Sequence, residues 1–445
     1  MCVDPAPPPP SALTRRGILA GAAALAGTAT ALTTATSAYA AGADAADAGA
    51  PEASPGTRPR GGDLVIEGGT LLDPATGHVT EDAVVVIVGG TVTAAGSRDA
   101  TRSARAQVPD GATVVDAHDH WVLPGLTDAH IHLNTVAEAR DALTSGATGA
   151  RSGSTDFFQD IAVRELAKQA PQQTPDLRAA GVFVTPDLAD TLLADPELAE
   201  LARRKDGVRD ADALRRVVRV NLDRGVDIVK TRVNERAGLP DQDPLAQVYD
   251  REQLSVVVDA ARRGGAGVLC HSYSERGCHD AVMAGIRSLE HGVYVGERTL
   301  REMRRRDTYF TPTLTAIAGL VDSDDPVLAE RGRTYLPVLK EAVRAAHEMG
   351  VPLAAGTDSS GGKVEPVGGE AELMREAGLP ALDAIRTVTT SAARLLGRER
   401  TSGRLAPGYA GDAVLLAADP LKHVATLKRP TTVIHAGHRV PKPRH

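Results

Sequence analysis

The sequence predicts an α/β fold, in which a (β/α)8 TIM barrel is inserted into a small β-domain built from both ends of the chain. Apolar, strand-like runs alternate with helical patterns through the middle of the sequence, which indicates a parallel sheet with covering helices. Short strands bounded by turns occur on both sides of this region. The chain has 445 residues, which suits a barrel of about 250 residues plus a smaller unit.

The individual elements follow from this pattern. Strands are expected at Leu64–Glu67, Ala83–Val88, Val226–Val229, Gly267–Cys270, Ala413–Leu416 and Thr432–Ile434, and a helix at Arg251–Arg263. The predicted domains are a composite β-sandwich of residues 62–124 and 397–440, and a barrel of residues 125–396.

The first forty residues are predicted to be a cleaved export signal. Arg15 and Arg16 precede a weakly apolar run that ends in the small-x-small pattern Ala38-Tyr39-Ala40. Paired arginines before such a run resemble a twin-arginine signal, so residues 1–40 imply the twin-arginine export machinery as a partner and an extracellular or cell-envelope location. The alternatives are an Ala-rich tail or a membrane anchor, and the Thr, Ser and Gly in the run argue against an anchor. Residues 41–61 are expected to form a flexible linker.

The composition favours a small-molecule ligand. A net charge of −7 argues against nucleic-acid binding, and 3% aromatic residues argue against a base-stacking platform. Three cysteines cannot form a disulfide framework, and the spacing of Cys270 and Cys278 leaves open whether they pair. Strand alternation places Cys270 in the core.

Two histidines at the end of an apolar strand form the strongest local motif. In the run Leu123–His132, His130 and His132 are two residues apart, so both imidazoles point the same way and could bind one metal ion. A lone His-x-His is a weak signal, and His118 with His120 forms a second one. This upstream pair precedes the strand and is interpreted as structural.

Other metal-capable residues end later strands. They are Lys230, His271, His291 and Asp358, the last of which follows an expected strand at Val351–Thr357. The carboxyl ends of strands are where barrel enzymes build their sites. A single residue of this kind is more often structural, whereas agreement among five strands is a much rarer accident.

The region from Asp63 to Val440 resembles the metal-dependent amidohydrolase superfamily, in particular its imidazolonepropionase-like and Xaa-Pro dipeptidase-like branch with a carboxylated lysine. The matching motifs are Val122–His132, Gly225–Lys230, Ala284–Gly292, Gly356-Thr357-Asp358 and Ala406–Ala413. The chain departs from the family at Arg151-Ser152, where relatives commonly have Arg-Asp, and at Arg232 and His271–Ser274.

The resemblance implies a site with two divalent cations, with Zn as the first choice and Mn, Fe or Co as alternatives. His130, His132 and Asp358 would hold one ion, His271 and His291 the other, and a CO2-derived carbamate on Lys230 would bridge them. A plain salt-bridging lysine is the alternative for Lys230. A hydroxide shared by the metals would attack the substrate, with Asp358 as general base and then acid.

Tyr273 and Arg232 each lie two residues beyond a proposed ligand, so strand alternation would keep them facing the site. Tyr273 could act as a catalytic residue by stabilising an oxyanion, and it could also contact substrate. Arg232 could bind a substrate carboxylate, and a barrel-rim ion pair is its alternative role.

The predicted enzyme is a secreted hydrolase of amide or peptide-like C–N bonds, with dipeptides or N-acyl amino acids as favoured small-molecule substrates. The alternatives are an esterase, lactonase or phosphotriesterase on the same site, and a non-catalytic secreted binding protein. Assembly into a homo-oligomer is left open.

Overall fold

The computed structural model describes residues 61–188 and 194–441. The predicted export signal, Cys2 and all but the last residue of the predicted linker lie outside these ranges. The described residues all belong to one unit of the chain.

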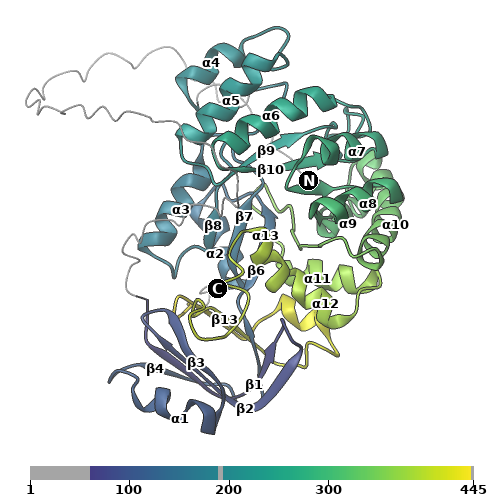
Figure 1. The fold of residues 1–445 in the computed structure, drawn as a ribbon. Helices are drawn as coiled ribbons and strands as arrows, with labels where there is room; N and C mark the ends of the chain where they lie inside the picture. Colours follow the sequence, from purple (N-terminus) through teal and green to yellow (C-terminus); the bar gives the residue numbers. More distant parts are fainter. Residues whose placement is uncertain (1–60, 189–193, 442–445) are drawn as a thin grey trace, which may run out of the picture. The chain divides into compact units, whose positions relative to one another are not determined.

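An eight-stranded sheet combines strands from both ends of the described region (Figure 1). Its order is β15-β14-β13-β5-β1-β2-β3, and β4 also pairs with β1. The strands are β1 (Leu64–Asp73), β2 (His78–Val88), β3 (Thr91–Ser97), β4 (Thr113–Asp116), β5 (Trp121–Pro124), β13 (Ala413–Leu416), β14 (Thr432–His435) and β15 (His438–Arg439). The antiparallel pairing of β5 with β13 joins the two ends of the chain.

Strand alternation explains why this sheet is apolar on both faces. Leu64 and Ile66 of β1 belong to one buried cluster, whereas Val65 between them belongs to another. Successive side chains of a strand point to opposite faces, so each face of β1 packs against its own set of neighbours.

Two parallel sheets form the middle of the chain. Their orders are β6-β7-β8 and β12-β11-β10-β9. The strands are β6 (Leu126–Ile131), β7 (Ala147–Ser152), β8 (Asp176–Arg178), β9 (Ile228–Arg232), β10 (Gly267–Ser272), β11 (Ser288–His291) and β12 (Tyr309–Thr311).

Short segments outside the named strands connect these two sheets. After β8, Ala179 accepts a hydrogen bond from Asp227 N at 2.8 Å, and Val184 N donates to Lys230 O at 2.9 Å. At the other side, Leu353 bridges to Phe310 of β12, and Ala129 N of β6 donates to Ala355 O at 2.8 Å. Residues 179–184 thus continue from β8 and bond to the β9 segment. Residues 353–355 bond to β12 on one side and to β6 on the other.

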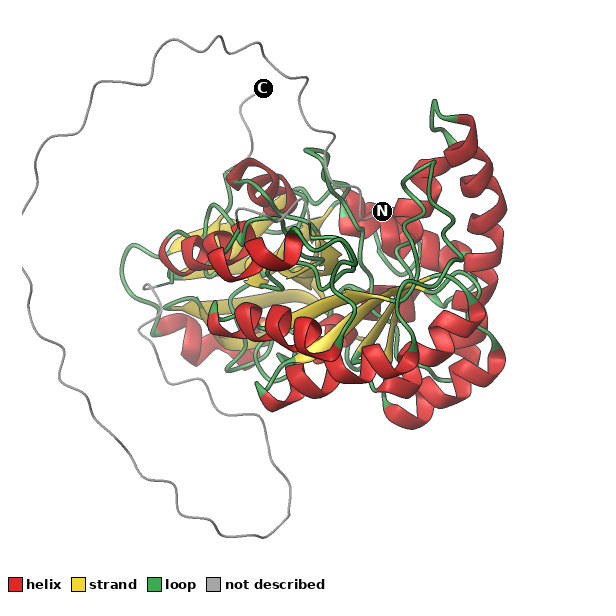
Figure 2. Ribbon diagram, turned by 90° about the horizontal axis from the view of Figure 1, so that it is seen from above, coloured by secondary structure: helices red, strands yellow, loops and turns green. Residues whose placement is uncertain are grey.

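Helices surround the strands (Figure 2). They are α1 (Arg98–Ala106), α2 (Val136–Thr144), α3 (Gln159–Gln169), α4 (Pro196–Ala202), α5 (Ala211–Asp223), α6 (Arg251–Arg263), α7 (Glu275–Ala284), α8 (Glu297–Arg306), α9 (Leu314–Val321), α10 (Pro326–Glu348), α11 (Val367–Glu376), α12 (Ala381–Thr387), α13 (Thr390–Leu395) and the 3-10 helix η2 (Val424–Lys428). No described helix is long and apolar enough to cross a membrane. Helices that alternate with parallel strands give the predicted α/β content.

Helix α6 shows how local sequence sets these boundaries. Asp250 caps its first turn and forms a capping box with Gln253. Leu254, Val257 and Ala261 are buried on one face, as a 3.6-residue period requires. The helix ends before Gly264, as predicted.

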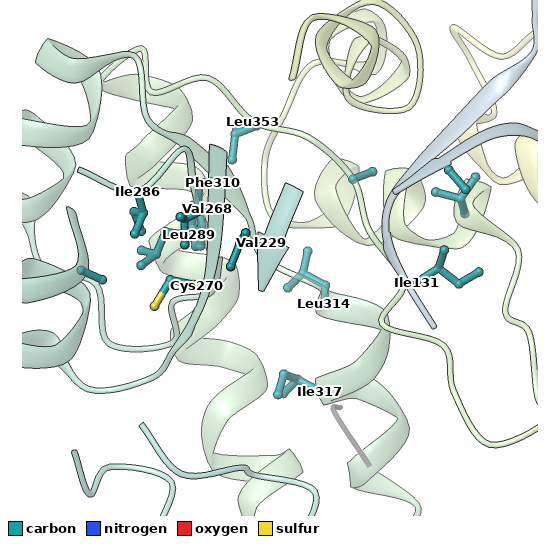
Figure 3. Packing of buried hydrophobic residues seen from close by; sticks show 14 of the residues in the cluster. Ile131, Val229, Val268, Cys270, Ile286, Leu289, Phe310, Leu314, Ile317 and Leu353 are labelled. Atoms are coloured by element: carbon teal, nitrogen blue, oxygen red, sulfur yellow. The ribbon is translucent and has the colours of Figure 1, made fainter. Parts of the chain in front are cut away.

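The apolar faces of β9 to β12 pack against helices (Figure 3). Val229, Val268, Cys270, Leu289 and Phe310 come from four neighbouring strands and belong to one buried cluster. Cys270 is therefore a core residue, as predicted, and both Cys270 and Cys278 are free thiols. Burial raises the pKa of Cys270 to about 12, so this thiol stays protonated near neutral pH.

Candidate metal centre

A histidine pair and one aspartate form a metal-capable group at the end of β6. His130 is a residue of β6, and His132 follows the strand by one residue. Oδ1 of Asp358 lies 3.3 Å from Nε2 of His130 and 3.1 Å from Nε2 of His132. One potential ligand atom from each residue lies within 4.8 Å of the others, and all three residues are buried. Imidazole nitrogen and carboxylate oxygen are donors that divalent transition metals accept.

His271 and His291 lie next to this group. Their ring centroids are 4.5 Å apart, and the ring of His291 lies 5.4 Å from that of His130. Nδ1 of His291 is 4.0 Å from Oδ2 of Asp358. Both histidines are fully buried. The second pair of predicted ligands therefore faces the first.

Lys230 lies among these imidazoles. Its Nζ is 3.0 Å from Nε2 of His130 and 5.6 Å from the ring centroid of Phe183, and the residue is fully buried. The structure thus brings together His130, His132, Lys230, His271, His291 and Asp358 from five separate segments.

The backbone at two of these residues adopts a left-handed conformation. His291 has a φ of 66° and Asp358 a φ of 55°. Such conformations are costly for residues with a side chain and concentrate at functional sites. The expected strand at Val351–Thr357 is wrong: the segment makes one isolated bridge, at Leu353. Its backbone bonds are divided among Phe310, Thr387 and β6, so no regular ladder forms.

Two glycines permit close packing around the histidine pair. A Cβ atom on Gly153 would lie 2.6 Å from Nε2 of His132, and one on Gly356 would lie 2.6 Å from Cβ of His130. Both separations are too short for real atoms, so any larger residue would displace a predicted ligand.

A buried ion-pair network that the sequence analysis missed fixes the orientation of His130. Oε2 of Glu290 lies 2.5 Å from Nδ1 of His130, and Nη2 of Arg151 donates to both oxygens of Glu290 at 3.1 Å. Arg151 also donates to Ser288 Oγ and to the carbonyl of Ala129. Burial by itself raises the pKa of Glu290, but Arg151 and His130 hold it at about 2, so this carboxylate is charged. A carboxylate on one ring nitrogen leaves the other nitrogen as the metal ligand.

The conformation of His291 explains why the sequence pattern does not predict Glu290 at the metal centre. Glu290 precedes His291 in a quoted motif, and strand alternation would point the two side chains to opposite faces. The positive φ of His291 breaks this alternation at the end of β11, so both residues reach the same centre.

Asp128 connects the histidine strand to the Asp358 segment. It accepts hydrogen bonds from His130 N, Thr357 N and Thr357 Oγ1 at 3.1, 3.1 and 2.7 Å. Burial raises the pKa of Asp128 to about 6, although these bonds oppose the shift. Asp128 therefore has a positioning role, because its contacts hold the backbone next to two predicted ligands.

Tyr273 lies against the predicted ligands. Its ring stacks on His291 with centroids 5.2 Å apart and contacts His271 at 4.8 Å. Tyr273 is fully buried, just after the end of β10.

Arg232 lies at the end of β9 and is 4% exposed. Its Nε donates to Thr185 Oγ1 at 2.8 Å, and its Nη1 pairs with Glu235. The predicted ion pair of Arg232 is therefore present. Binding of a substrate carboxylate by Arg232 stays a prediction.

The upstream pair His118 and His120 is placed differently. The side chain of His118 is 65% exposed and pairs with Asp116, and Nδ1 of His120 contacts the carbonyl of His118. These contacts are local to the turn between β4 and β5, which agrees with a structural interpretation.

Comparison with known proteins identifies the family. The family model described as "Amidohydrolase family" matches residues 121–440. The chain belongs to this family. Membership confirms the family predicted from the motifs, and it supports the predicted class of enzyme, a hydrolase of carbon–nitrogen bonds.

The similar proteins include ochratoxinase of Aspergillus niger, which is 28% identical over 236 residues. That alignment covers 52% of this chain and 48% of the ochratoxinase, so it spans about half the length of the relative. A solved structure of a Xaa-Pro dipeptidase with bound methionine has a TM-score of 0.74 at 23% identity and covers 85% of this chain and 99% of that one. The structure of A. niger ochratoxinase has a TM-score of 0.70 at 22% identity and covers 86% and 96%. At these identities the structural likeness concerns the fold.

Proposed function

We propose that the protein is an exported, metal-dependent amidohydrolase that hydrolyses an amide or peptide-like C–N bond in dipeptides or N-acyl amino acids. The observation that carries this proposal is the buried convergence of His130, His132 and Asp358, with Lys230 and two further imidazoles beside them. Ochratoxinase and Xaa-Pro dipeptidase, named above as similar proteins, favour the same bond class.

The donor set fits two divalent cations. His130, His132 and Asp358 would hold one ion, and His271 and His291 the other, with Lys230 between them as a carbamate. An ammonium has no lone pair for a cation, whereas a carbamate offers two anionic oxygens. When bound, such ions supply an acidified water and polarise the scissile carbonyl.

Three side chains would carry out proton transfer, stabilisation of the carbonyl oxygen and substrate binding. Asp358 takes a proton from the attacking water and delivers it to the departing nitrogen, since its carboxylate lies at the centre of the ligand group. The Tyr273 hydroxyl stabilises negative charge on the carbonyl oxygen. Arg232 binds a substrate carboxylate from the end of β9.

We also propose that the two parallel sheets close into one (β/α)8 barrel, and that the eight-stranded sheet forms a separate β-sandwich. The links at residues 179–184 and 353–355 support closure. The amides of Ala129 and Val184 should then resist hydrogen exchange as strongly as amides within β9 to β12. Rapid exchange at either amide would mean an open sheet.

Export is proposed from Arg15, Arg16 and the small residues at Ala38–Ala40. The protein recovered outside the cytoplasm should begin near residue 41. A recovered chain that retains Arg15 would contradict cleavage at this position.

The central test combines metal analysis with a hydrolysis screen. Protein loaded with Zn or Mn should contain about two ions per chain and should hydrolyse dipeptides or N-acyl amino acids. A chain that takes up no metal would be a binding protein. If the metal-loaded chain cleaves lactones or phosphotriesters but no amide, the protein is an esterase, lactonase or phosphotriesterase instead.

A further inference from the structure

A cavity of about 390 Å3 lies beside the candidate metal centre. It is lined by some of the residues within three segments, 186–187, 204–209 and 232–242, at the side where β9 ends. A volume of this size is typical of pockets for small molecules. It is large enough for an amino-acid residue.

The cavity and the metal centre share a stretch of backbone. Arg232 lines the cavity, lies two residues beyond Lys230 on β9, and pairs in register with His271 of β10. Glu235 also lines the cavity, and its carbonyl oxygen lies 3.0 Å from Nε2 of His271. Two residues of a strand span about 7 Å. An occupant of the cavity can therefore present its neighbouring bond to the metal centre.

The lining of the cavity is positively charged. Its basic side chains are Arg204, Lys205, Arg209, Arg232 and Arg236. Its acidic side chains are Asp187, Asp206 and Glu235. The lining thus has two more basic than acidic side chains, and one of the basic ones, Arg204, is already paired with Asp210 at 2.7 Å, whereas the whole chain has a net charge of −7.

Among these cations, the buried Arg232 is the one that an anionic ligand would stabilise most. Arg232 is 4% exposed, and its guanidinium pairs with Glu235. A carboxylate that enters the cavity adds a second opposing charge beside this buried guanidinium.

Hydrogen bonds from helix α10 fix the loop at residues 237–242, next to the cavity. Arg331 of α10 donates to the carbonyls of Ala237 and Leu239 at 3.0 and 2.6 Å and to those of Pro240 and Gln242 at 3.3 and 2.5 Å. A wall fixed in this way loses little conformational entropy when a ligand binds.

We propose that this cavity binds the amino-acid residue released by hydrolysis, and that the preferred residue is acidic, so that the substrate brings two carboxylates to it. The inference rests on the proposed function and specifies its substrate class. One carboxylate pairs with Arg232, and the other faces the cations at Lys205, Arg209 and Arg236. A second carboxylate complements this basic lining, whereas the side chain of a lysine or arginine residue is repelled by it.

A matched pair of substrates tests the proposal. N-acetylglutamate and N-acetylglutamine have the same shape and differ by one charge. For the metal-loaded chain, kcat/KM for N-acetylglutamate should be at least tenfold higher than for N-acetylglutamine, with the D and L forms of both compared. Equal or reversed values would overturn the proposal and leave the proposed function intact, because the amide is still cleaved.

Binding measured by calorimetry separates this proposal from the catalytic one. N-acetylglutamate should bind the full chain at least tenfold more tightly than N-acetylglutamine, whether or not turnover occurs. If neither compound is hydrolysed but this preference holds, the preference of the cavity for an acidic residue stands without the proposed activity on these compounds. Equal affinities would overturn the preference for an acidic residue.

Charge-removing variants locate the effect. Arg236→Met should reduce the preference for N-acetylglutamate at least threefold, and the exposed Lys205→Met, which leaves the buried part of the cavity intact, should reduce it about twofold. Arg203→Met is the matched control, because Arg203 is exposed and adjacent in sequence but does not line the cavity. An equal effect of all three substitutions would indicate general electrostatic attraction and contradict a specific site.

Discussion

Charged groups gather at both ends of the parallel strands, and the two ends provide them with different partners. At the amino end, Asp176 of β8 pairs with Arg398, and Asp412 accepts hydrogen bonds from His435 Nδ1 and Ala436 N at 2.9 and 2.7 Å. At the carboxyl end, one oxygen of Asp358 lies close to two imidazole nitrogens.

The difference separates a structural cluster from a reactive one. The carboxylates at the amino end each have a cationic or backbone donor as partner, which suits a group that only holds the fold together. The carboxyl end instead collects imidazoles and a carboxylate around one point, which suits an added cation. A cluster of charged side chains alone therefore does not identify a site, whereas the geometry of the cluster does.

Asp358→Asn tests the reactive end most directly. It should lower kcat/KM by about 10²–10⁴-fold, because the amide cannot accept the proton of the attacking water. Steady-state kinetics, circular dichroism and metal content should be measured together, so that lost base function is distinguished from lost metal. Asp324→Asn, at an exposed position, is the control. Full activity in the Asp358 variant would remove this residue from the mechanism.

Glu290→Gln tests the network behind His130. It should weaken metal binding by about 10–100-fold, because His130 loses its orienting carboxylate. It should also lower the free energy of unfolding by about 3–5 kcal/mol, because Arg151 stays buried without its counter-charge. Metal titration and urea unfolding give the two values, with exposed Glu330→Gln as the control. Unchanged metal affinity would make the network purely structural.

Glu370→Gln tests a buried carboxyl group that is held by backbone and hydroxyl donors. Glu370 accepts hydrogen bonds from Leu314 N, Thr315 N and Thr315 Oγ1, and burial raises its pKa from 4.5 to about 7. Because the folded state holds this proton more tightly, the free energy of unfolding should fall as pH rises from about 4.5 to about 7, by about 3 kcal/mol in total.

The Gln variant should lose this part of the pH dependence. Urea unfolding at pH 5, 6, 7 and 8 measures it, and Glu376→Gln on the exposed side of α11 is the matched control. A constant difference between the wild-type protein and the variant over this range would mean that Glu370 does not titrate there.

Asp412→Asn should affect stability alone. Asp412 raises the pKa of His435, although burial opposes the shift, so their pairing stabilises the fold below about pH 6.5 and is lost as pH rises through the higher folded value. We expect a loss of about 1–3 kcal/mol at pH 6 and an unchanged kcat/KM. Thermal unfolding and kinetics provide the check, with exposed Asp110→Asn as the control. A selective loss of activity would mean that the two ends are coupled.

Much of the fold could be predicted from periodicity and capping. The helix at Arg251–Arg263 matches α6 in both bounds, because a capping box and a final glycine mark its ends in the sequence itself. The segment at Val351–Thr357 could not be predicted as it is. Its apolar residues resemble a strand, but its hydrogen bonds go to partners distant in the sequence.

The candidate site could also be predicted only where local sequence spacing determines the geometry. His130 and His132 follow from an i, i+2 spacing that fixes their common direction. Arg151, Glu290 and Asp128 could not be assigned, because each acts through a residue from another segment. Nothing in the sequence near Arg232 indicated that four other basic side chains line the same cavity.

The sequence by itself determined the family, the alternation of strands and helices, and the residue types able to bind metal, since these depend on local pattern and short-range chemistry. Tertiary structure decided which of those residues meet, how Glu290 and Arg151 orient His130, and where positive charge surrounds a cavity. These features depend on contacts between segments up to 229 positions apart, as in the bond from Thr357 to Asp128. Only the packing of the folded chain brings such segments together.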